Sequence, residues 1–364
     1  MKIEEYNLKQ LVSPLLEWYK SHARILPWRE YSTPYRVWVS EIMLQQTRVE
    51  AVKPYFERFV KALPDVRSLA ECPEEKLLKL WEGLGYYNRV RNMQTAARQV
   101  MENYKGSLPE EYGELLKLKG IGHYTAGAIS SIAYGKCAPA VDGNVLRVIS
   151  RGAADERDIM KQSVRSNMET ELLKILPKDQ PGAFNQGLME LGATVCLPNG
   201  EPKCGECPWA SFCLARAEGK ISWIPVKSKG KERRMEERTV LLIRDGEKVL
   251  LRRRPEKGLL AGMYEFPNVD GFLDEKDALE QVKSMGLSPL RIETLESSKH
   301  IFSHVEWRMK GYMVKVEALG GEESGFLFAE TADFKEKFAM PSAFRAYVQY
   351  LDILQGKDNI VQGD

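Results

Sequence analysis

The stretch Leu118–Ala126, LKGIGHYTA, places two glycines around a tight turn that opens onto a helix, and the later segment PAVDGNV carries an isolated acid, Asp142. A G-x-G turn, here Gly120 and Gly122, presents backbone N–H groups at a helix N-terminus, which suits a phosphate. Glycine pairs also close helices for packing reasons, and Asp142 could equally be the N-cap of a helix that begins near Val145. The pattern alone leaves an anion site and a plain helical junction equally open.

Length and composition indicate an ordinary globular chain. Its 364 residues predict two or three domains, and 43% hydrophobic residues suffice for buried cores. The net charge is only +2, so any affinity for nucleic acid must come from local basic patches. The opening residues, MKIEEYNLKQ, are acidic where a signal peptide would be basic, and no long apolar run follows. We therefore expect a cytoplasmic protein with no membrane partner.

Four of the six cysteines crowd into CLPNGEPKCGECPWASFC, namely Cys196, Cys204, Cys207 and Cys213. In a reducing compartment such a group indicates a metal site rather than disulfides. Four thiolates can bind a tetrahedral zinc ion or a [4Fe-4S] cluster. Zinc sites more often come as two close pairs, whereas only the middle two cysteines here form a CxxC. The spacing favours iron and sulfur, and four unligated thiols are the remaining alternative.

The hydrophobic period changes along the chain. Up to about residue 220 it is helical, and Thr33 followed by proline predicts a helix that starts there and runs through Arg48. A basic stretch without apolar periodicity, residues 223–237, is predicted to be a linker. Beyond it the period becomes 2, with a hairpin predicted around Asp245-Gly246 and strands at 301–305 and 307–316. A second, α+β domain is therefore expected over 238–356.

LKGIGHYTAGA, AVDGNVLRV and the four-cysteine run, in that order, resemble the helix-hairpin-helix DNA glycosylases of the endonuclease III superfamily over residues 1–220. Within it, LPWR (26–29), WVSEIMLQQTRV (38–49), WEGLGYYNRVRN (81–92) and VDGNV resemble the blocks of the MutY family of adenine DNA glycosylases. The resemblance implies a multi-domain protein with an all-α glycosylase domain over 1–222. That domain would contain a six-helix barrel at about 28–136 beside an iron-sulfur module from 1–27 and 137–222, in which the four cysteines hold a [4Fe-4S] cluster.

The second domain resembles a Nudix fold through GLLAGMYEFP, residues 258–267. The acidic Nudix box is missing, because ALEQVKSMG (278–286) occupies the place of the metal-binding glutamates. The resemblance therefore implies a domain that reads the lesion and does not hydrolyse nucleotides.

Removing a purine from deoxyribose needs an acid that protonates the leaving base and an anion that stabilises the oxocarbenium sugar. By resemblance Glu41 is the acid and Asp142 the anion. Apolar neighbours would raise the pKa of Glu41, while a helix N-terminus would keep Asp142 ionised. From periodicity alone, Glu41, Gln45 and Arg48 form a stripe that favours a solvated face.

Other site residues are also implied by the family match. Tyr124 stands where bifunctional members carry a Schiff-base lysine, so the enzyme is expected to be monofunctional, with Tyr124 and Asn144 positioning the sugar and Asp142; otherwise Tyr124 only packs and Asn144 only caps. The residues matching the adenine pocket are Arg24, Trp28, Arg29, Leu44 and Gln186. Those matching duplex contacts are Gln46, Thr47, Leu84 and Tyr86, together with Gly120 and Gly122 of the turn. Phe302, Ser303 and His304 match the loop that reads 8-oxoguanine.

The resulting interpretation is a monomeric, nucleoid-associated enzyme that binds duplex DNA with adenine opposite 8-oxoguanine or G and removes the adenine. One alternative is an endonuclease III-like glycosylase for oxidised pyrimidines, disfavoured by Tyr124. Another is a non-catalytic lesion-binding protein, disfavoured by Glu41 and Asp142. Nucleotide-pool hydrolysis by the Nudix-like part lacks its metal ligands. The loop LPNGEPK is one residue longer than is usual in the family, and we still expect the cluster to form.

Overall fold

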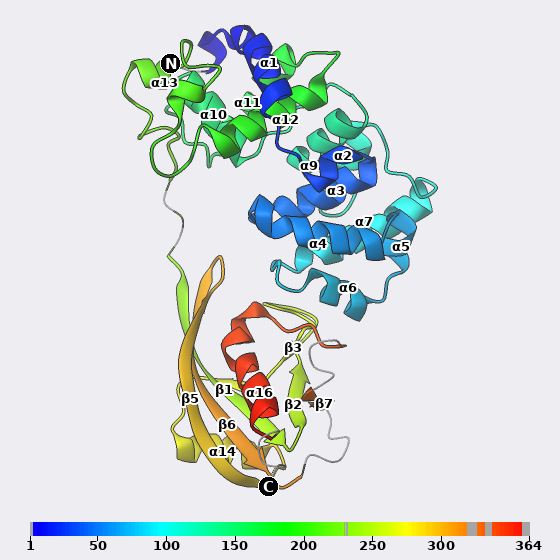
Figure 1. Ribbon diagram of the computed structural model, residues 1–364, viewed down its shortest axis with the longest axis vertical. Helices are drawn as coiled ribbons and strands as arrows, with labels where there is room; N and C mark the ends of the chain where they lie inside the picture. The colour runs from blue at the N-terminus through cyan, green and yellow to red at the C-terminus, as the bar shows by residue number, and fades with distance from the viewer. Residues whose placement is uncertain (1–2, 229, 231, 319–325, 332–336, 359–364) are drawn as a thin grey trace. The chain divides into compact units, whose positions relative to one another are not determined.

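Helices build the first of two units into which the chain divides, Met1–Cys72 with Asn88–Lys229, and a mixed sheet builds the second, Pro73–Tyr87 with Gly230–Asp364. The computed structural model describes residues 3–228, 230, 232–318, 326–331 and 337–358 (Figure 1). The predicted fold class, an all-α part followed by an α+β part, is confirmed.

The elements of the first unit are short. They are η1 (Ile3–Glu5), η2 (Leu8–Leu11), α1 (Val12–His22), α2 (Pro27–Glu30), α3 (Pro34–Leu44), α4 (Val49–Ala62), α5 (Val66–Glu71), α7 (Asn88–Asn103), α8 (Tyr112–Leu115), α9 (His123–Ala128), the π-helical turn η3 (Ile129–Ala133), α10 (Gly143–Gly152), α11 (Gln162–Ile175), α12 (Pro181–Thr194), η4 (Cys204–Glu206) and α13 (Leu214–Ala217).

Helix α3 begins as predicted and ends earlier than predicted. The Thr33 side chain accepts a hydrogen bond from the Arg36 backbone N–H at 3.3 Å, the expected N-cap. The helix stops at Leu44 because Gln46 takes a left-handed backbone conformation, φ +59°, which no right-handed helix can contain. The predicted run through Arg48 was therefore too long, and the break exposes Gln46 between α3 and α4.

A continuous core joins the N-terminal segment to the helices after residue 140. Leu11 and Leu15 pack with Leu146 and Ile149 of α10 and Leu188 of α12, all at most 1% exposed. Apolar residues at helical spacing in η2 and α1 supply this face. This packing fixes the first residues of the chain beside α10 and α12, the helices that carry site residues.

The glycine turn lies between α8 and α9, with His123 as the first residue of α9. Gly120 has φ +78°, and a Cβ there would lie 2.7 Å from Cβ of Asn92. Both the backbone conformation and the close approach require glycine at this position. The predicted turn that opens onto a helix is confirmed.

The second unit contains α6 (Glu74–Trp81), β1 (Arg234–Asp245), β2 (Lys248–Arg253), β3 (Tyr264–Glu265), β4 (Asn268–Asp270), α14 (Glu275–Ser284), β5 (Pro289–Ile301), β6 (Val305–Val316), β7 (Phe326–Glu330), η5 (Ser342–Phe344) and α16 (Arg345–Asp358). The sheet order is β3-β2-β1-β6-β5, with β1 and β6 parallel (Figure 1). Strand β1 starts at Arg234, inside the stretch expected to be a linker, because it pairs with β6 from Arg234 opposite Val305 onward. The hairpin at Asp245-Gly246 is confirmed, with Asp245 opposite Lys248.

The period-2 pattern of β1 places a separate core on each face of the sheet. Val240 and Leu242 pack in one core with Phe344 and Tyr347, beside the start of α16, whereas Leu241 and Ile243 pack in the other with α14. The segment ALEQVKSMG forms most of α14, and it buries Ala278 and Val282. This helix therefore has a packing function in place of the acidic metal site.

The sequence predicted a strand over 301–305, but the structure ends β5 at Ile301 and begins β6 at Val305, so residues 302–304 form the tip of the β5–β6 hairpin. The backbone N–H of Phe302 donates to the carbonyl of Val305 at 2.8 Å, which closes the turn. The Phe302 ring packs edge-on against Trp307, while Ser303 and His304 are exposed. Alternation of side chains alone could not separate this tip from the two strands that it joins.

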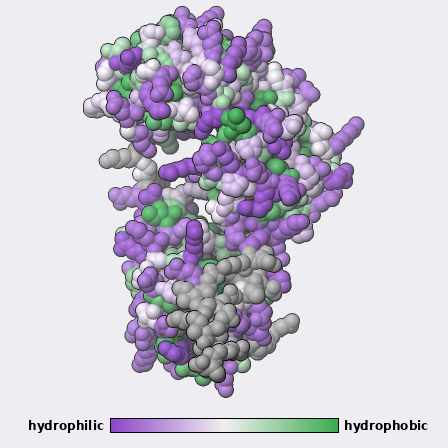
Figure 2. All heavy atoms as spheres, viewed as in Figure 1, coloured by the Kyte–Doolittle hydropathy of each residue, from purple (hydrophilic) through white to green (hydrophobic). Residues whose placement is uncertain are grey.

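The face drawn in Figure 2 is mostly hydrophilic, with hydrophobic residues in small groups among charged ones. Within the described part of the chain, every helix is too short or too polar to cross a lipid bilayer. Apolar side chains are instead concentrated in the cores of the two units.

Candidate active site and four-cysteine site

A cavity of about 1160 Å³ lies within the first unit and gathers every residue predicted for catalysis and for the adenine pocket. Its lining includes Glu41, Tyr124, Asp142, Asn144, Arg24, Trp28, Arg29, Leu44, Gln186, Gln46 and Thr47. These side chains come from α2, α3, α9, α10 and α12 and the segments beside them, which are far apart in sequence. Gly120 and Gly122 lie outside the lining, and Leu84, Tyr86, Phe302, Ser303 and His304 belong to the second unit.

Glu41 is buried in the cavity wall, only 6% exposed, so the solvated face suggested by its periodicity was wrong. Helix α3 is buried on nearly every side, from Val37 to Met43. Burial raises the pKa of Glu41 to about 7, and a hydrogen bond from Tyr124 and the charge of Arg29 partly offset that rise. The carboxyl is thus able to carry a proton near neutral pH.

Tyr124, the second residue of α9, donates its hydroxyl hydrogen to Oε2 of Glu41. Burial, with the charges of Glu41 and Asp142, raises the pKa of Tyr124 well above its usual range. The phenol therefore stays neutral and remains a donor. Since Tyr124 occupies one carboxyl oxygen, the Glu41 proton belongs on the other one.

Asp142 caps helix α10, as one reading of the sequence proposed. Its Oδ1 accepts from the Val145 N–H at 2.8 Å, and its Oδ2 accepts from Nδ2 of Asn144 at 2.7 Å. Burial raises the pKa of Asp142, while these two donors and the charge of Arg147 lower it in part. The expectation from the helix N-terminus alone missed the burial, which acts in the opposite direction.

Arg147 was not predicted, although it is a charged residue within the apolar run NVLRVIS and stands three positions after Asn144. Its Nη2 donates to Oδ1 of Asn144 at 2.8 Å and to the carbonyl of Gly192 at 2.9 Å, and its Nε donates to the carbonyl of Cys196 at 2.8 Å. Arg147 therefore fixes the Asn144 amide that in turn holds Asp142.

Glu190 of α12 is the second residue that the sequence did not reveal. Its side chain is fully buried and binds Arg24 and Arg29, with 2.5 Å from Oε1 to Nε of Arg24 and 2.8 Å from Oε2 to Nη2 of Arg29. The helical spacing of Gln186 and Glu190 places both on one face of α12, which was the available signal.

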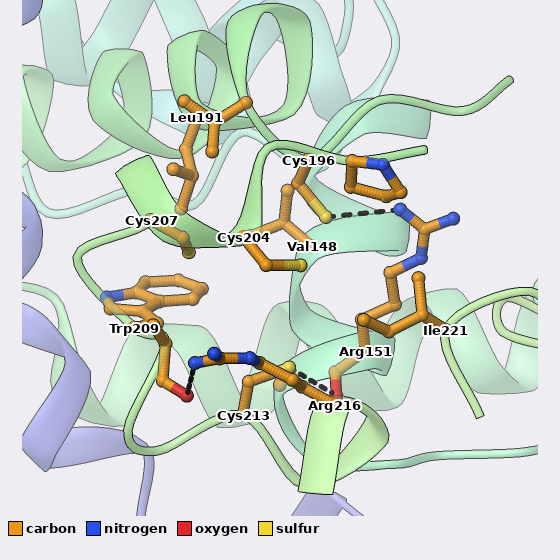
Figure 3. A pocket seen from close by; sticks show the side chains of 14 residues that line it. Val148, Arg151, Leu191, Cys196, Cys204, Cys207, Trp209, Cys213, Arg216 and Ile221 are labelled. Carbon is orange, nitrogen blue, oxygen red and sulfur yellow. Dashed lines mark hydrogen bonds between the residues drawn. The ribbon is translucent and has the colours of Figure 1, made fainter. Parts of the chain in front are cut away.

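The four cysteines line one smaller cavity together with Trp209, Arg151 and Arg216 (Figure 3). Arg151 donates from Nη1 to Sγ of Cys196 at 3.3 Å. Burial raises the pKa of the Cys207 thiol to about 12, so a metal would have to displace its proton. Among the residues that the structure describes, no three Cys, His, Asp or Glu side chains converge closely enough to hold a metal ion.

That arrangement bears on which group the cysteines fit. A zinc ion needs its sulfur ligands about 2.3 Å from a single point. In a [4Fe-4S] cluster each cysteine binds a different iron, so the four sulfurs stand around a cavity and do not converge. Four thiols around one cavity, with an arginine donating to one of them, fit the cluster better than a single ion.

Family models match both units. Residues 39–177 match the HhH-GPD superfamily of base excision DNA repair proteins, and residues 239–350 match the NUDIX domain. The thermostable thymine-DNA glycosylase of known structure is 29% identical, with a TM-score of 0.52, over 58% of this chain and 96% of that one. Endonuclease III trapped in a covalent complex with DNA is 25% identical, with a TM-score of 0.50, over 58% and 98%.

Relatives that align with most of the chain identify the family. The adenine DNA glycosylase of Buchnera aphidicola subsp. Acyrthosiphon pisum (strain APS) is 34% identical over 301 residues, which cover 82% of this chain and 84% of that protein. The adenine DNA glycosylase of Mus musculus is 35% identical over 363 residues, covering 84% and 70%. The chain belongs to the adenine DNA glycosylases, base excision repair enzymes with a helix-hairpin-helix catalytic part and a Nudix-type C-terminal part.

Proposed function

We propose that this adenine DNA glycosylase acts on duplex DNA in which adenine is paired with 8-oxoguanine or G, and that it hydrolyses the N-glycosidic bond with Glu41 as general acid and Asp142 as the stabilising anion. The observation that carries the assignment is the pairing of two carboxyls with different environments in one cavity. Glu41 is buried and accepts a hydrogen bond from the Tyr124 hydroxyl, and Asp142 accepts hydrogen bonds from two donors.

Glu41 makes the adenine a better leaving group by giving it a proton as the glycosidic bond breaks. The pKa of about 7 suits this role, since the acid is protonated in a useful fraction of molecules and can still release its proton. Tyr124 keeps the carboxyl oriented and offers no amine for a Schiff base. The enzyme is therefore proposed to be monofunctional, with no strong lyase activity.

Asp142 faces the sugar, which becomes positively charged as the base leaves, and it stabilises the oxocarbenium ion or a covalent intermediate. The fixed hydrogen bonds to Val145 and Asn144 hold the carboxylate in place before the charge develops. Preorganised groups of this kind need no rearrangement during the reaction.

The adenine is proposed to occupy the part of the cavity lined by Arg24, Trp28, Arg29, Leu44 and Gln186. Extruding a base costs a few kcal/mol, which side chains inserted into the stack must offset. Gln46 and Tyr86 both have left-handed backbone conformations, φ +59° and +48°, which is consistent with such inserted positions. Thr47 and Leu84 would flank them, and the turn with Gly120 and Gly122 would meet a phosphate.

The proposed activities divide the chain into two domains and a connecting segment. Residues 1–222 are proposed as the catalytic domain, with a barrel at 28–136 and a cluster module from 1–27 and 137–222. Residues 223–237 connect it to the lesion-reading domain, 238–356. We propose that the enzyme works as a monomer at the chromosome, because one chain carries both the catalytic residues and the reader.

The substrate assignment can be tested on three duplexes, with adenine opposite 8-oxoguanine, adenine opposite G, and thymine glycol opposite A. Each is incubated with the enzyme and split, and one half is treated with alkali to cut abasic sites. We expect alkali-dependent cleavage of the two adenine duplexes, faster for 8-oxoguanine. Cleavage of the thymine glycol duplex without alkali would instead indicate an oxidised-pyrimidine enzyme with lyase activity.

We propose that Cys196, Cys204, Cys207 and Cys213 hold a [4Fe-4S] cluster, which would stabilise the fold around α10 and η4. Purified protein should be brown, with absorbance near about 400 nm from charge transfer between thiolate and iron. Cys204→Ser should lower both the iron content and the soluble yield. Cys137→Ser, an exposed cysteine outside the cavity, is the control and should change neither. Colourless, active protein that contains zinc would contradict the cluster.

Discrimination of 8-oxoguanine from G is assigned to the hairpin tip with Ser303 and His304. The lesion carries an N7 proton that guanine lacks, and the exposed Ser303 hydroxyl can accept from it. One hydrogen bond contributes about 0.5–1.5 kcal/mol, at most about tenfold in preference. Excision below saturation is expected to be faster for adenine opposite 8-oxoguanine than for adenine opposite G. The double variant Ser303→Ala with His304→Ala should therefore lower the ratio of these two rates by up to about tenfold.

The control for the hairpin tip is Ser297→Ala, an exposed serine on strand β5 of the same hairpin. Removing the second domain, with the chain ending before Gly230, should narrow the ratio further and leave residual excision of adenine. If both variants kept the full preference for 8-oxoguanine over G, then 8-oxoguanine would have to be recognised by Gln46 and Tyr86.

A further inference from the structure

Glu190, which forms ion pairs with Arg24 and Arg29, has no part in the chemistry described above. Glu190 is a buried acid in the wall of the same cavity as Glu41. Four hydrogen bonds reach its carboxylate, from the backbone N–H, Nε and Nη2 of Arg24 and from Nη2 of Arg29. Arg29 also donates from Nη1 to the carbonyl of Arg24 at 3.1 Å. The group thus joins α12 to α2 and to the segment between α1 and α2.

We propose that Glu190 is a positioning residue for adenine excision, which fixes Arg24 and Arg29 at the wall of the cavity and balances their charge beside the protonated Glu41. The proposal rests on the role of Glu41 proposed above. Its geometric basis is that a single carboxylate holds both guanidiniums, and each arginine side chain also lines the cavity.

The need for charge balance follows from the groups that face Glu41. These are Tyr124 of α9, Asp142 before α10 and Arg29 of α2. Arg29 favours the ionised form of Glu41, so an unbalanced arginine there would remove the proton that the reaction needs. Glu190 stays ionised to oppose it: burial raises the pKa of Glu190, but Arg24 and Arg29 lower it further, with a net decrease.

Removing the charge of Glu190 while keeping its shape should therefore move the pH profile of excision. Glu190→Gln leaves two cations in place of a net single positive charge. The pKa of Glu41 should fall, and because the acid must be protonated, the alkaline limb of the rate should move to lower pH. One unbalanced charge in the wall of the same cavity is expected to shift the limb by about one pH unit.

The matched variant is Arg29→Gln, which removes the cation and should move the alkaline limb to higher pH. The double variant, Glu190→Gln with Arg29→Gln, has the wild-type net charge, and its limb should return towards the wild-type position. Glu50→Gln is the control, because it tests whether removing any carboxylate from the cavity lining moves the limb. Glu50 also lines the cavity but is exposed and paired with Lys53, so water screens its charge and the limb should stay.

The measurement is the single-turnover rate of adenine excision between about pH 5 and about pH 9, with duplex affinity measured on the same variants. Opposite shifts for the two single variants, with undiminished affinity in Glu190→Gln, support the proposal. A rate of Glu190→Gln that falls equally at every pH shows a structural role only and overturns it. If Glu190→Gln does not fold, Arg29→Gln decides, and an unmoved limb in that variant overturns the charge balance.

Failure of this inference is distinct from failure of the proposed function. Glu41→Gln is measured in the same assay. If Glu41→Gln kept the activity and the alkaline limb of the wild type, Glu41 would not be the general acid. If Glu41→Gln is inactive and the limb ignores Glu190 and Arg29, Glu41 keeps its role and only the inference about Glu190 is wrong.

Discussion

Asp142→Asn is expected to bind duplex DNA containing adenine opposite 8-oxoguanine with the affinity of the wild type and to lose excision by about 10³-fold. The amide has the shape of the carboxylate but no charge to oppose the developing oxocarbenium ion. The fold should survive, because asparagine is as good an N-cap as aspartate. Single-turnover excision, duplex binding and thermal unfolding measure the three expectations.

A small stability cost is also expected from the hydrogen bonds. Both oxygens of Asp142 accept from donors, Val145 N–H and Asn144 Nδ2. The amide nitrogen of the variant must face one of these donors, so one hydrogen bond is lost, at about 1 kcal/mol. Asp274→Asn is a matched control, since Asp274 caps α14 through the Asp277 N–H at 2.9 Å and lies far along the chain from the cavity residues.

The control separates capping from catalysis. Asp274→Asn should leave excision unchanged. Its free energy of unfolding measures how much stability the same substitution removes at the start of another helix. If Asp142→Asn excised adenine within a few-fold of the wild-type rate, the charge of Asp142 would not act on the transition state, and its function would be limited to capping α10.

Local sequence signals predicted the parts of this fold that depend on local physics. The glycine turn at Gly120, the Thr33 cap and the Asp245-Gly246 hairpin each need a backbone conformation or a donor that a few neighbouring residues define. A side chain at position 120 would clash with Asn92, which is distant in sequence. The positive φ of Gly120 alone already favours glycine there.

Long-range contacts explain what the sequence did not show. Helix α3 is buried on almost all sides, so its periodicity gave no indication that Glu41 faces a cavity. Arg24 and Glu190 are 166 residues apart, and no local pattern joins them. The early end of α3 at Leu44 comes from the conformation of Gln46, without a glycine or proline to mark it.

The two carboxyls of the proposed active site show the same difference between local signals and long-range contacts. The N-cap role of Asp142 was visible as an acid before an apolar helix. The burial that raises the pKa of both Asp142 and Glu41 depends on helices brought together only in the folded chain. Predicting the residue types was therefore possible, but predicting the electrostatic environment of Asp142 required the structure.

Glu41→Gln is expected to lower excision by about 10²–10⁴-fold, because an amide cannot supply a proton to the leaving adenine. In the wild type the rate should fall as pH rises through about 7, the pKa to which burial raises Glu41. The residual rate of the variant should lack that alkaline limb. Single-turnover rates across the pH range measure both effects.

The burial of Glu41 predicts that the substitution that lowers activity raises stability at high pH, relative to wild type. The pKa of Glu41 is about 7 in the folded protein and near its ordinary value of about 4.3 when unfolded, so the folded state binds more protons between these values. Stability contributed by the neutral carboxyl is complete below about pH 4 and is lost as pH rises to about 7. Glutamine never ionises, so Glu41→Gln should escape this loss.

We therefore expect the free energy of unfolding of Glu41→Gln, relative to wild type, to rise by about 2–3 kcal/mol between pH 5 and pH 8, less where water enters the cavity. Urea denaturation at the two pH values measures it. Glu30→Gln removes an exposed carboxylate from α2 and is the control, with no such change expected. If Glu41→Gln were inactive but the difference between its free energy of unfolding and that of the wild type were the same at both pH values, the Glu41 carboxyl would lie in water, where it could not hold its proton for the reaction.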